Sequence, residues 1–285
     1  MNKVIIEAVF DEPKQKIWQA ITQPEAMKVW YFDINNFKLE ENTIFSFYEA
    51  GEKKQYFHEC KMLQIIPEAL LQHTWTHPQQ SKGSSTLTWN IESISSNKTK
   101  VTLTHIGLET FADGGVAFAP ENFEMGWNVL VKTNLRNYLY NIKKLTFEVK
   151  IEASAETVWN KMWDKKSYTK WTTPFCAGTY FTGEIELGSR IHFIAPSFDG
   201  MYSDVFYLIP NKLIIFKHIG NLKDLKEQPI DAEAEKWTGS FETYKLNEAD
   251  GITTVTAEID CVPEYIDYMN EKFPLALQEL KNISE

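Results

Sequence analysis

Residues 17–30 read IWQAITQPEAMKVW, and residues 158–171 read VWNKMWDKKSYTKW. Each stretch opens with an aliphatic residue and a tryptophan, and a second tryptophan closes it at the same interval. An alternating apolar run precedes each stretch, at residues 4–10 and at residues 147–153. A repeat separated by about half of the chain is too long for a solenoid, whose units span roughly 20–50 residues. The pattern predicts two copies of one globular domain.

The repeat divides the chain of 285 residues into a first domain, residues 1–143, and a second domain, residues 144–285. Both lengths match the usual size of a domain, roughly 100–150 residues. A domain of this length buries about 68% of its unfolded surface, so it needs no metal or disulfide for stability. The cysteines Cys60, Cys176 and Cys261 are scattered, which favours free thiols over a disulfide framework or a zinc site. We therefore expect neither a metal nor a cofactor.

The composition narrows the class of partners and the location. The net charge is −10, and the sequence has no basic stripe of the kind that nucleic acids require. The N-terminus reaches Glu7 without the apolar core of a signal peptide. No window approaches the ~18 apolar residues of a membrane-spanning helix. These features predict a soluble cytoplasmic protein that binds no nucleic acid and does not span a membrane.

After the repeated helical stretch, the hydrophobic period of the first copy falls to two. Five consecutive runs have strand character, and turn-forming residues separate them. These runs are residues 45–47, 57–66, 71–75, 87–91 and 101–105. Alternation of this kind in consecutive short strands is typical of an antiparallel sheet with one covered face and one wet face.

A long helix at the end of each copy supplies the cover for that sheet. From Pro120 to Ile142 the apolar residues return to a period of 3.6 and form one stripe. At 1.5 Å per residue, about 22 residues span roughly 33 Å, which is enough to cross a sheet. The second copy follows the same order and ends with a helix that begins near Pro263. The sequence thus predicts an α+β protein with two tandem domains. In each, two short helices follow the first strand, and a curved antiparallel sheet wraps around a long C-terminal helix.

This order of elements resembles the START-like helix-grip superfamily, which includes the birch-pollen allergen type. Within it, the first copy looks like the family named after the C-terminal domain of the activator of the large heat-shock chaperone ATPase. The residues that carry the resemblance are Ile17, Trp18, Trp30, the strand end TLTHIG at residues 102–107, Gly126, Trp127, Leu130 and Leu135. The second copy keeps Trp159 and Trp171 but lacks the His-x-Gly and Gly-Trp elements, so it resembles the superfamily only.

The resemblance implies a cavity between sheet and helix, but not its use. The superfamily includes lipid carriers, hormone receptors, aromatic cyclases and chaperone regulators, and a shared fold does not decide among them.

Two histidines are expected on the covered face of the first sheet. The strand alternation places His73 and His105 there, whereas the repeat alignment puts Phe216 and Ile259 at the corresponding positions of the second copy. A buried polar group without a partner costs roughly 1–3 kcal/mol, so each imidazole needs one. The sequence leaves three interpretations open: structural histidines, histidines that orient a polar group of a ligand, and acid/base catalysis.

Large aromatic residues are expected around the same space. Trp75, Trp89, Phe123 and Trp127 either pack the core or line a ligand pocket, since both need flat apolar side chains with few polar groups. The turn Asp113-Gly114-Gly115 precedes the long helix, where glycine's conformational freedom would suit a lid over the cavity mouth.

No catalytic motif is present: the sequence lacks a Gly-x-Ser-x-Gly elbow, a phosphate-binding glycine loop and a His-Glu-x-x-His pair. The main hypothesis is therefore non-catalytic binding of a hydrophobic or amphipathic small molecule, chiefly in the first domain. The expected ligand-binding residues are His73, Trp75, Trp89, His105, Phe123 and Trp127. One alternative is an interaction protein that regulates a chaperone, as the family resemblance implies. Another is a cavity enzyme of the aromatic cyclase or hydrolase type that uses His73 or His105.

Overall fold

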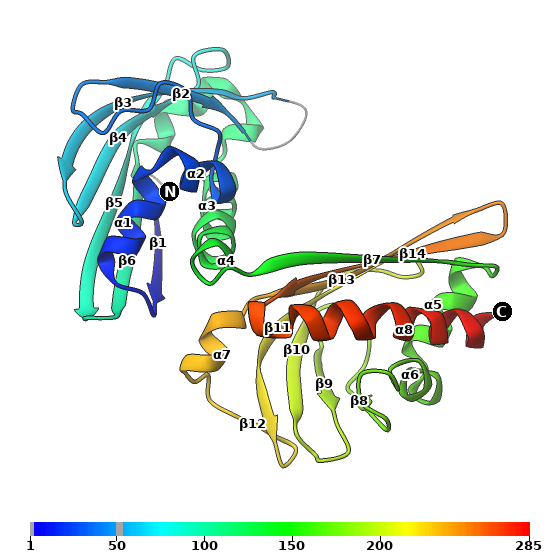
Figure 1. Ribbon diagram of the computed structural model, residues 1–285. Coiled ribbons are helices and arrows are strands. Elements are labelled where there is room, and N and C mark those ends of the chain that lie inside the picture. Colours follow the sequence, from blue (N-terminus) through cyan, green and yellow to red (C-terminus); the bar gives the residue numbers. More distant parts are fainter. Residues whose placement is uncertain (1–2, 50–53) are drawn as a thin grey trace. The chain divides into compact units, whose positions relative to one another are not determined.

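The computed structural model describes residues 3–49 and 54–285. The chain divides into two compact units, Met1–Tyr140 and Asn141–Glu285. Each unit contains a large antiparallel sheet and a C-terminal helix (Figure 1), which confirms the predicted α+β class. The boundary predicted at residues 143 and 144 falls at the start of β7 (Lys143–Ile151).

The first unit is built on a six-stranded antiparallel sheet with the order β1-β6-β5-β4-β3-β2. Two short helices follow the first strand, as predicted, and the other strands follow the helices. The elements are β1 (Lys3–Phe10), α1 (Lys14–Thr22), α2 (Pro24–Trp30), β2 (Ile44–Tyr48), β3 (Phe57–Ile66), β4 (Leu70–Thr76), β5 (Ser84–Ser95) and β6 (Lys98–Ile106). Strict alternation of buried residues in β4 and β6 turns one face of this sheet toward the core.

A helical chain covers that face. Two 3-10 segments, η1 (Leu108–Gly114) and η2 (Val116–Phe118), lead into α3 (Pro120–Val129). The helix continues through η3 (Leu130–Leu135), a π-helical segment, and ends with α4 (Arg136–Leu139). The predicted stripe was one uninterrupted α-helix to Ile142, so the sequence missed both the π segment and the earlier end.

The π segment follows from the spacing of the buried residues. Trp127, Val131, Leu135 and Leu139 are all buried and stand four positions apart. In an α-helix each interval of four overshoots a full turn by about 40°, so four such residues would drift off the sheet. The wider i→i+5 turn takes up this drift and keeps all four side chains in the core.

The second unit repeats the plan with three additional elements, the strands β8 and β12 and the helix α7. Its main sheet has the order β7-β14-β13-β11-β10-β9-β8, and β12 pairs with β11 at the side. A short helix, α7, is inserted before β13. The elements after β7 are α5 (Ala155–Trp163), α6 (Lys165–Trp171), β8 (Tyr180–Thr182), β9 (Arg190–Ile194), β10 (Gly200–Ile209), β11 (Leu213–Lys223), β12 (Lys226–Glu227), α7 (Ala232–Trp237), β13 (Phe241–Ala249), β14 (Ile252–Cys261), η4 (Pro263–Tyr265) and α8 (Ile266–Ser284).

The repeated tryptophans tie the two short helices together in each unit. The Trp30 indole N–H donates to the carbonyl of Ala20 at 2.9 Å, and the Trp171 indole N–H donates to the carbonyl of Met162 at 3.1 Å. Both indoles are buried, so these hydrogen bonds also satisfy the polar edge of a core residue. The repeated tryptophans of the sequence therefore make the same hydrogen bond between the two short helices in both units. None of the described helices combines the length and the apolar character needed to cross a bilayer.

A candidate ligand cavity in the first domain

The first unit contains a cavity of about 270 Å³ between the sheet and the helix α3. His58 of β3 and Trp75 of β4 lie on the sheet side. Phe118 of η2 and the α3 residues on one helix face lie on the other side. That face consists of Asn122, Phe123, Gly126 and Trp127, and it continues to Leu130. The cavity thus occupies the place between sheet and helix that the family resemblance implied.

Aromatic side chains form most of the wall. The ring centroids of Trp75 and Trp127 are 5.0 Å apart, in an edge-to-face arrangement. Phe118 and Phe123 stand beside the His77 ring, with centroids at 4.8 Å and 6.2 Å. Such walls offer flat apolar contact to a ligand of similar shape.

Two imidazoles interrupt the aromatic wall. His58 and His77 are 5% and 4% exposed, and their ring centroids are 4.3 Å apart. The Trp75 indole N–H donates to His77 Nε2 at 3.0 Å, which places the His77 proton on Nδ1. Within the described part of the chain, neither His58 Nδ1 nor His77 Nδ1 has a hydrogen-bond partner. Buried polar groups normally do have partners, so these two atoms stand out.

Burial keeps both imidazoles neutral. It lowers the pKa of His77 to about 4, and burial together with the neighbouring His77 lowers the pKa of His58 to about 3. The carboxylate of Glu49 lies at the same cavity and accepts hydrogen bonds from the backbone N–H groups of Gln55 and Tyr56. At neutral pH the lining therefore carries a negative charge and two uncharged donor or acceptor rings.

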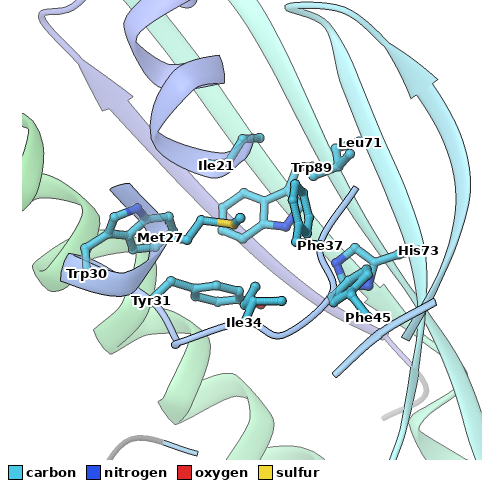
Figure 2. Close-up of a pocket in the computed structure, with 10 residues that line it drawn as sticks. All are labelled: Ile21, Met27, Trp30, Tyr31, Ile34, Phe37, Phe45, Leu71, His73 and Trp89. Carbon is cyan, nitrogen blue, oxygen red and sulfur yellow. The ribbon is translucent and has the colours of Figure 1, made fainter. Parts of the chain in front are cut away.

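The residues expected from the sequence separate into three sets. Trp75, Phe123 and Trp127 line the large cavity. His73 and Trp89 instead line a second space of only about 10 Å³, where aliphatic and aromatic side chains crowd around them (Figure 2). That volume is about one water molecule in size, so it cannot accept an organic ligand without rearrangement.

His105 forms the third set, because it lines neither space. It is fully buried, and its Nδ1 accepts the Trp127 indole N–H at 3.0 Å. Its Nε2 must then carry the proton and donate to Ser85 Oγ at 2.7 Å, and Ser85 in turn donates to the carbonyl of Trp75. Burial and the nearby His73 and His77 lower the pKa of His105 to about 3. In this arrangement His105 positions Trp127 and has no free nitrogen for a ligand.

Sequence reasoning missed His58 and His77, although the strand pattern carried the signal for both. In β3, His58 alternates in phase with the buried Cys60 and Met62. His77 follows β4 in phase with His73 and Trp75. Extending the alternation two residues past the predicted run at residues 71–75 would have placed His77 on the covered face.

Hydrogen bonds hold one end of the turn Asp113-Gly114-Gly115, which was expected to form a lid. Asp113 accepts hydrogen bonds from Ser81 Oγ and from the backbone N–H of Lys82, and these donors lower the pKa of Asp113. Gly115 has a φ of +82°, which only glycine adopts without strain. The segment that reaches the cavity is η2, whose Phe118 packs on His77.

The covered face of the second sheet is less apolar than the sequence indicated. Phe216 and Ile259 are buried, as the repeat alignment predicted. Next to Phe216, however, Ser203 Oγ lies 2.8 Å from His218 Nδ1, and His218 Nε2 lies 3.4 Å from the Glu242 carboxylate. Ser203 is fully buried, so its hydrogen bond to His218 is internal to the domain.

Comparison with known proteins covers the first domain most directly. Residues 11–140 match the family described as Activator of Hsp90 ATPase homolog 1-like protein. A search of curated proteins finds no match. Among solved structures, the solution structure of the Aha1 dimer from Colwellia psychrerythraea is 25% identical, over 50% of this chain and 96% of that chain, with a TM-score of 0.40.

Two other solved structures are similar over the whole length. DynU16, a putative protein in the dynemicin biosynthetic locus, is 11% identical over 100% of both chains, with a TM-score of 0.41. The di-domain ARO/CYC BexL from the BE-7585A biosynthetic pathway is 13% identical over 100% of this chain and 99% of that chain, with a TM-score of 0.42. The resemblance seen in the sequence is confirmed by the family match: residues 11–140 match the Activator of Hsp90 ATPase homolog 1-like family, and the unit that contains them is an antiparallel sheet covered by a C-terminal helix.

Proposed function

We propose that the first domain binds a small hydrophobic or amphipathic molecule in the cavity of about 270 Å³ and does not transform it. One observation carries the proposal: a space of ligand size lies between sheet and helix, and aromatic side chains and the rings of His58 and His77 line it. A ligand would contribute apolar contact at roughly 25 cal/mol per Å² of buried area.

The same imidazoles are poorly suited to acid/base catalysis. A general base works best when its pKa lies near the working pH. The pKa values of His58 and His77, about 3 and about 4, lie far below neutrality. Neutral rings of this kind are weak bases but good hydrogen-bonding groups, which favours recognition over proton abstraction.

Gly126 offers a direct test of the cavity. It lies on the lining face of α3, and a Cβ added there would meet no atom within 4 Å. The substitution Gly126→Phe should fill the cavity while removing a glycine that disfavours the helix by up to ~1 kcal/mol. We expect naphthalene to bind the native protein in isothermal titration calorimetry, and to bind Gly126→Phe at least about tenfold more weakly.

The matched control is Met125→Phe. Met125 precedes Gly126 in the same helix, is 64% exposed and does not line the cavity. It should leave naphthalene binding unchanged. Native mass spectrometry of gently purified protein should also detect bound lipid-like molecules in the native protein and in the control. Equal affinity in Gly126→Phe and the native protein, or the absence of any binding, would exclude this cavity as the site.

Regulation of a chaperone is a second candidate function, and the family match over residues 11–140 favours it. The measurement is the ATPase rate of purified Hsp90 with and without this chain. A rate that does not change at saturating concentration would remove this candidate and leave the ligand-binding proposal untouched.

A further inference from the structure

The structure points to the charge of the ligand. We infer that the cavity of about 270 Å³ takes an aromatic organic cation, a small ring that carries a quaternary ammonium group, which the Glu49 carboxylate attracts. This inference deepens the proposed function and rests on it.

The first step is the charge of the cavity lining. Glu49 belongs to the lining, and none of the described lining residues is a lysine or an arginine. Burial lowers the pKa values of the His58 and His77 side chains to about 3 and about 4, so both rings are uncharged at neutral pH. The described lining therefore carries one negative charge and no positive charge. The field of this charge extends over several ångströms in a partly enclosed space, so it acts on a ligand without direct contact.

The second step concerns the kind of cation. The two Glu49 carboxylate oxygens accept hydrogen bonds from the backbone N–H groups of Gln55 and Tyr56, which hold the carboxylate in place without neutralising it. A primary ammonium group would bring three N–H donors into a mostly aromatic space, and each of them needs an acceptor once it leaves water. A quaternary ammonium group has no N–H, and its charge is spread over methyl groups. It therefore gains the attraction of Glu49 at a lower cost of desolvation.

The third step concerns the aromatic walls. Tyr56 and Trp75 line the cavity from the side of the sheet, and Phe118, Phe123 and Trp127 line it from the helical chain. The faces of aromatic rings carry partial negative charge, and tryptophan is the strongest of them as a partner of a cation. Rings on both sides of the space, together with one carboxylate, are suited to a quaternary ammonium ion.

The fourth step concerns size and the exclusion of anions. The cavity is roughly twice the 150 Å³ of an apolar cavity that holds benzene, which suits one ring together with a trimethylammonium group. An anion of the same shape would lose its hydration without gaining a counter-ion from the described lining, and Glu49 would repel it. The lining thus distinguishes ligands of equal shape by the sign of their charge.

The trimethylammonium group also occurs in choline lipids, where a phosphate stands next to it. The described lining offers neither a lysine nor an arginine to that phosphate. We therefore assign the site to a cation without a neighbouring anion. Hexyltrimethylammonium should bind more tightly than hexylphosphocholine. The reverse order would assign the site to a lipid headgroup and overturn the inference.

The main test compares three benzene derivatives whose substituents are all tetrahedral. Phenyltrimethylammonium is positive, tert-butylbenzene is neutral and benzenesulfonate is negative. Calorimetry on the native protein at neutral pH should show phenyltrimethylammonium binding at least as tightly as tert-butylbenzene and at least about tenfold more tightly than benzenesulfonate.

Two charge variants locate the origin of this preference. Glu49→Gln should weaken the binding of phenyltrimethylammonium about tenfold, strengthen that of benzenesulfonate and leave that of tert-butylbenzene unchanged. The chain has a net charge of −10, which attracts cations in general, so the control must remove one charge elsewhere. Glu59→Gln does this: Glu59 is exposed, follows the lining residue His58 in β3 and lies on the other face of the sheet. It should leave all three affinities unchanged.

Gly126→Phe supplies the location. It should weaken the binding of phenyltrimethylammonium and tert-butylbenzene alike, because both occupy the space that the new ring fills. Thermal unfolding verifies that each variant is folded. If Glu49→Gln does not fold, the comparison of the three ligands on the native protein and on Gly126→Phe still decides the question.

The outcomes separate this inference from the proposed function. If neither tert-butylbenzene nor the other two molecules bind, the ligand-binding proposal itself fails. If tert-butylbenzene binds but benzenesulfonate is as tight as phenyltrimethylammonium, the cavity is a site without a preference for cations. Tighter binding of tert-butylbenzene than of phenyltrimethylammonium, or an unchanged affinity for the cation in folded Glu49→Gln, would overturn the inference in the same way.

Discussion

Four of the residues that carry the family resemblance lie around one buried hydrogen bond: His105, Gly107, Gly126 and Trp127. His105 accepts the indole N–H of Trp127 and thereby fixes that ring at the edge of the cavity. Gly107 ends β6 with a φ of +85°, and a Cβ there would contact the backbone of Ser85, the other partner of His105. Gly126 leaves open space next to Trp127. The His-x-Gly and Gly-Trp elements together hold an aromatic wall in place and keep the space beside it empty.

This arrangement predicts that His105 acts on stability. The substitution His105→Phe leaves the Trp127 N–H without an acceptor and overfills a site that is fully buried. We expect a loss of about 1–3 kcal/mol in the free energy of unfolding of the first domain, measured by urea denaturation at pH 8. A variant with native stability would contradict the positioning role.

At the scale of residues, the sequence predicted part of the site. Strand alternation placed His73, Trp75, Trp89 and His105 on the covered face, and all four are buried there. Alternation predicts which face of the sheet a residue lies on, but not where on that face it lies. It therefore could not show that Trp75 borders the large cavity, whereas Trp89 and His73 border the nearly closed one. The hydrogen bonds that occupy both nitrogens of His105 depend on residues from three elements, and no local pattern encodes them.

Helices show where the hydrophobic period is a sufficient guide and where it is not. The apolar stripe after Pro120 predicted a long covering helix, and that helix exists. Buried residues spaced four apart over three intervals, however, also fit the wider turn of a π-helix. Whether such a stripe twists around an α-helix or is kept straight by a π segment depends on the sheet against which the helix packs. The interior proline of α8 is the complementary case: Pro274 is exposed, so water can satisfy the carbonyl whose partner it removes, and the helix runs on from Ile266 to Ser284.

This reading of α8 leads to a stability prediction. Pro274 carries the helix-interior penalty of up to ~3 kcal/mol relative to alanine without making a buried contact. Pro274→Ala should therefore raise the free energy of unfolding of the second domain by about 1–3 kcal/mol, seen as a higher-temperature transition in differential scanning calorimetry. Pro263→Ala serves as the control, because Pro263 stands at the first position of η4, where proline is tolerated. An equal effect of both changes would show that the interior position of Pro274 is not the cause.

The first domain buries several histidines in the neutral form. Four of the six histidines of the chain are His58, His73, His77 and His105 of the first domain, and burial holds their pKa values at about 3 to 4. In the unfolded chain each has a pKa near ~6.5. Below that pH the unfolded chain binds protons that the folded domain does not, so stability is complete above pH ~6.5 and falls as the pH decreases toward 4.

We therefore expect the first domain to unfold in mild acid. Each histidine contributes a slope of up to about 1.4 kcal/mol per pH unit in this window, so the free energy of unfolding should fall steeply between pH 6.5 and 4.5. Hydrogen exchange measured by mass spectrometry at a series of pH values can follow each domain separately. His73→Phe removes one of the four groups and should reduce the proton uptake of the first domain by about one. A first domain whose stability is flat across this range would mean that the imidazoles are not held neutral.

The ring arrangement of the first domain also has an optical consequence. The Trp30 and Trp89 centroids are 6.1 Å apart, those of Trp89 and Trp127 are 6.3 Å apart, and Trp127 lies 5.0 Å from Trp75. Indoles this close exchange excitation in both directions, so quenching at one ring lowers the emission of the others. Trp75 and Trp127 border the large cavity, so a ligand in contact with them should change the emission of the whole series and report occupancy without an attached dye.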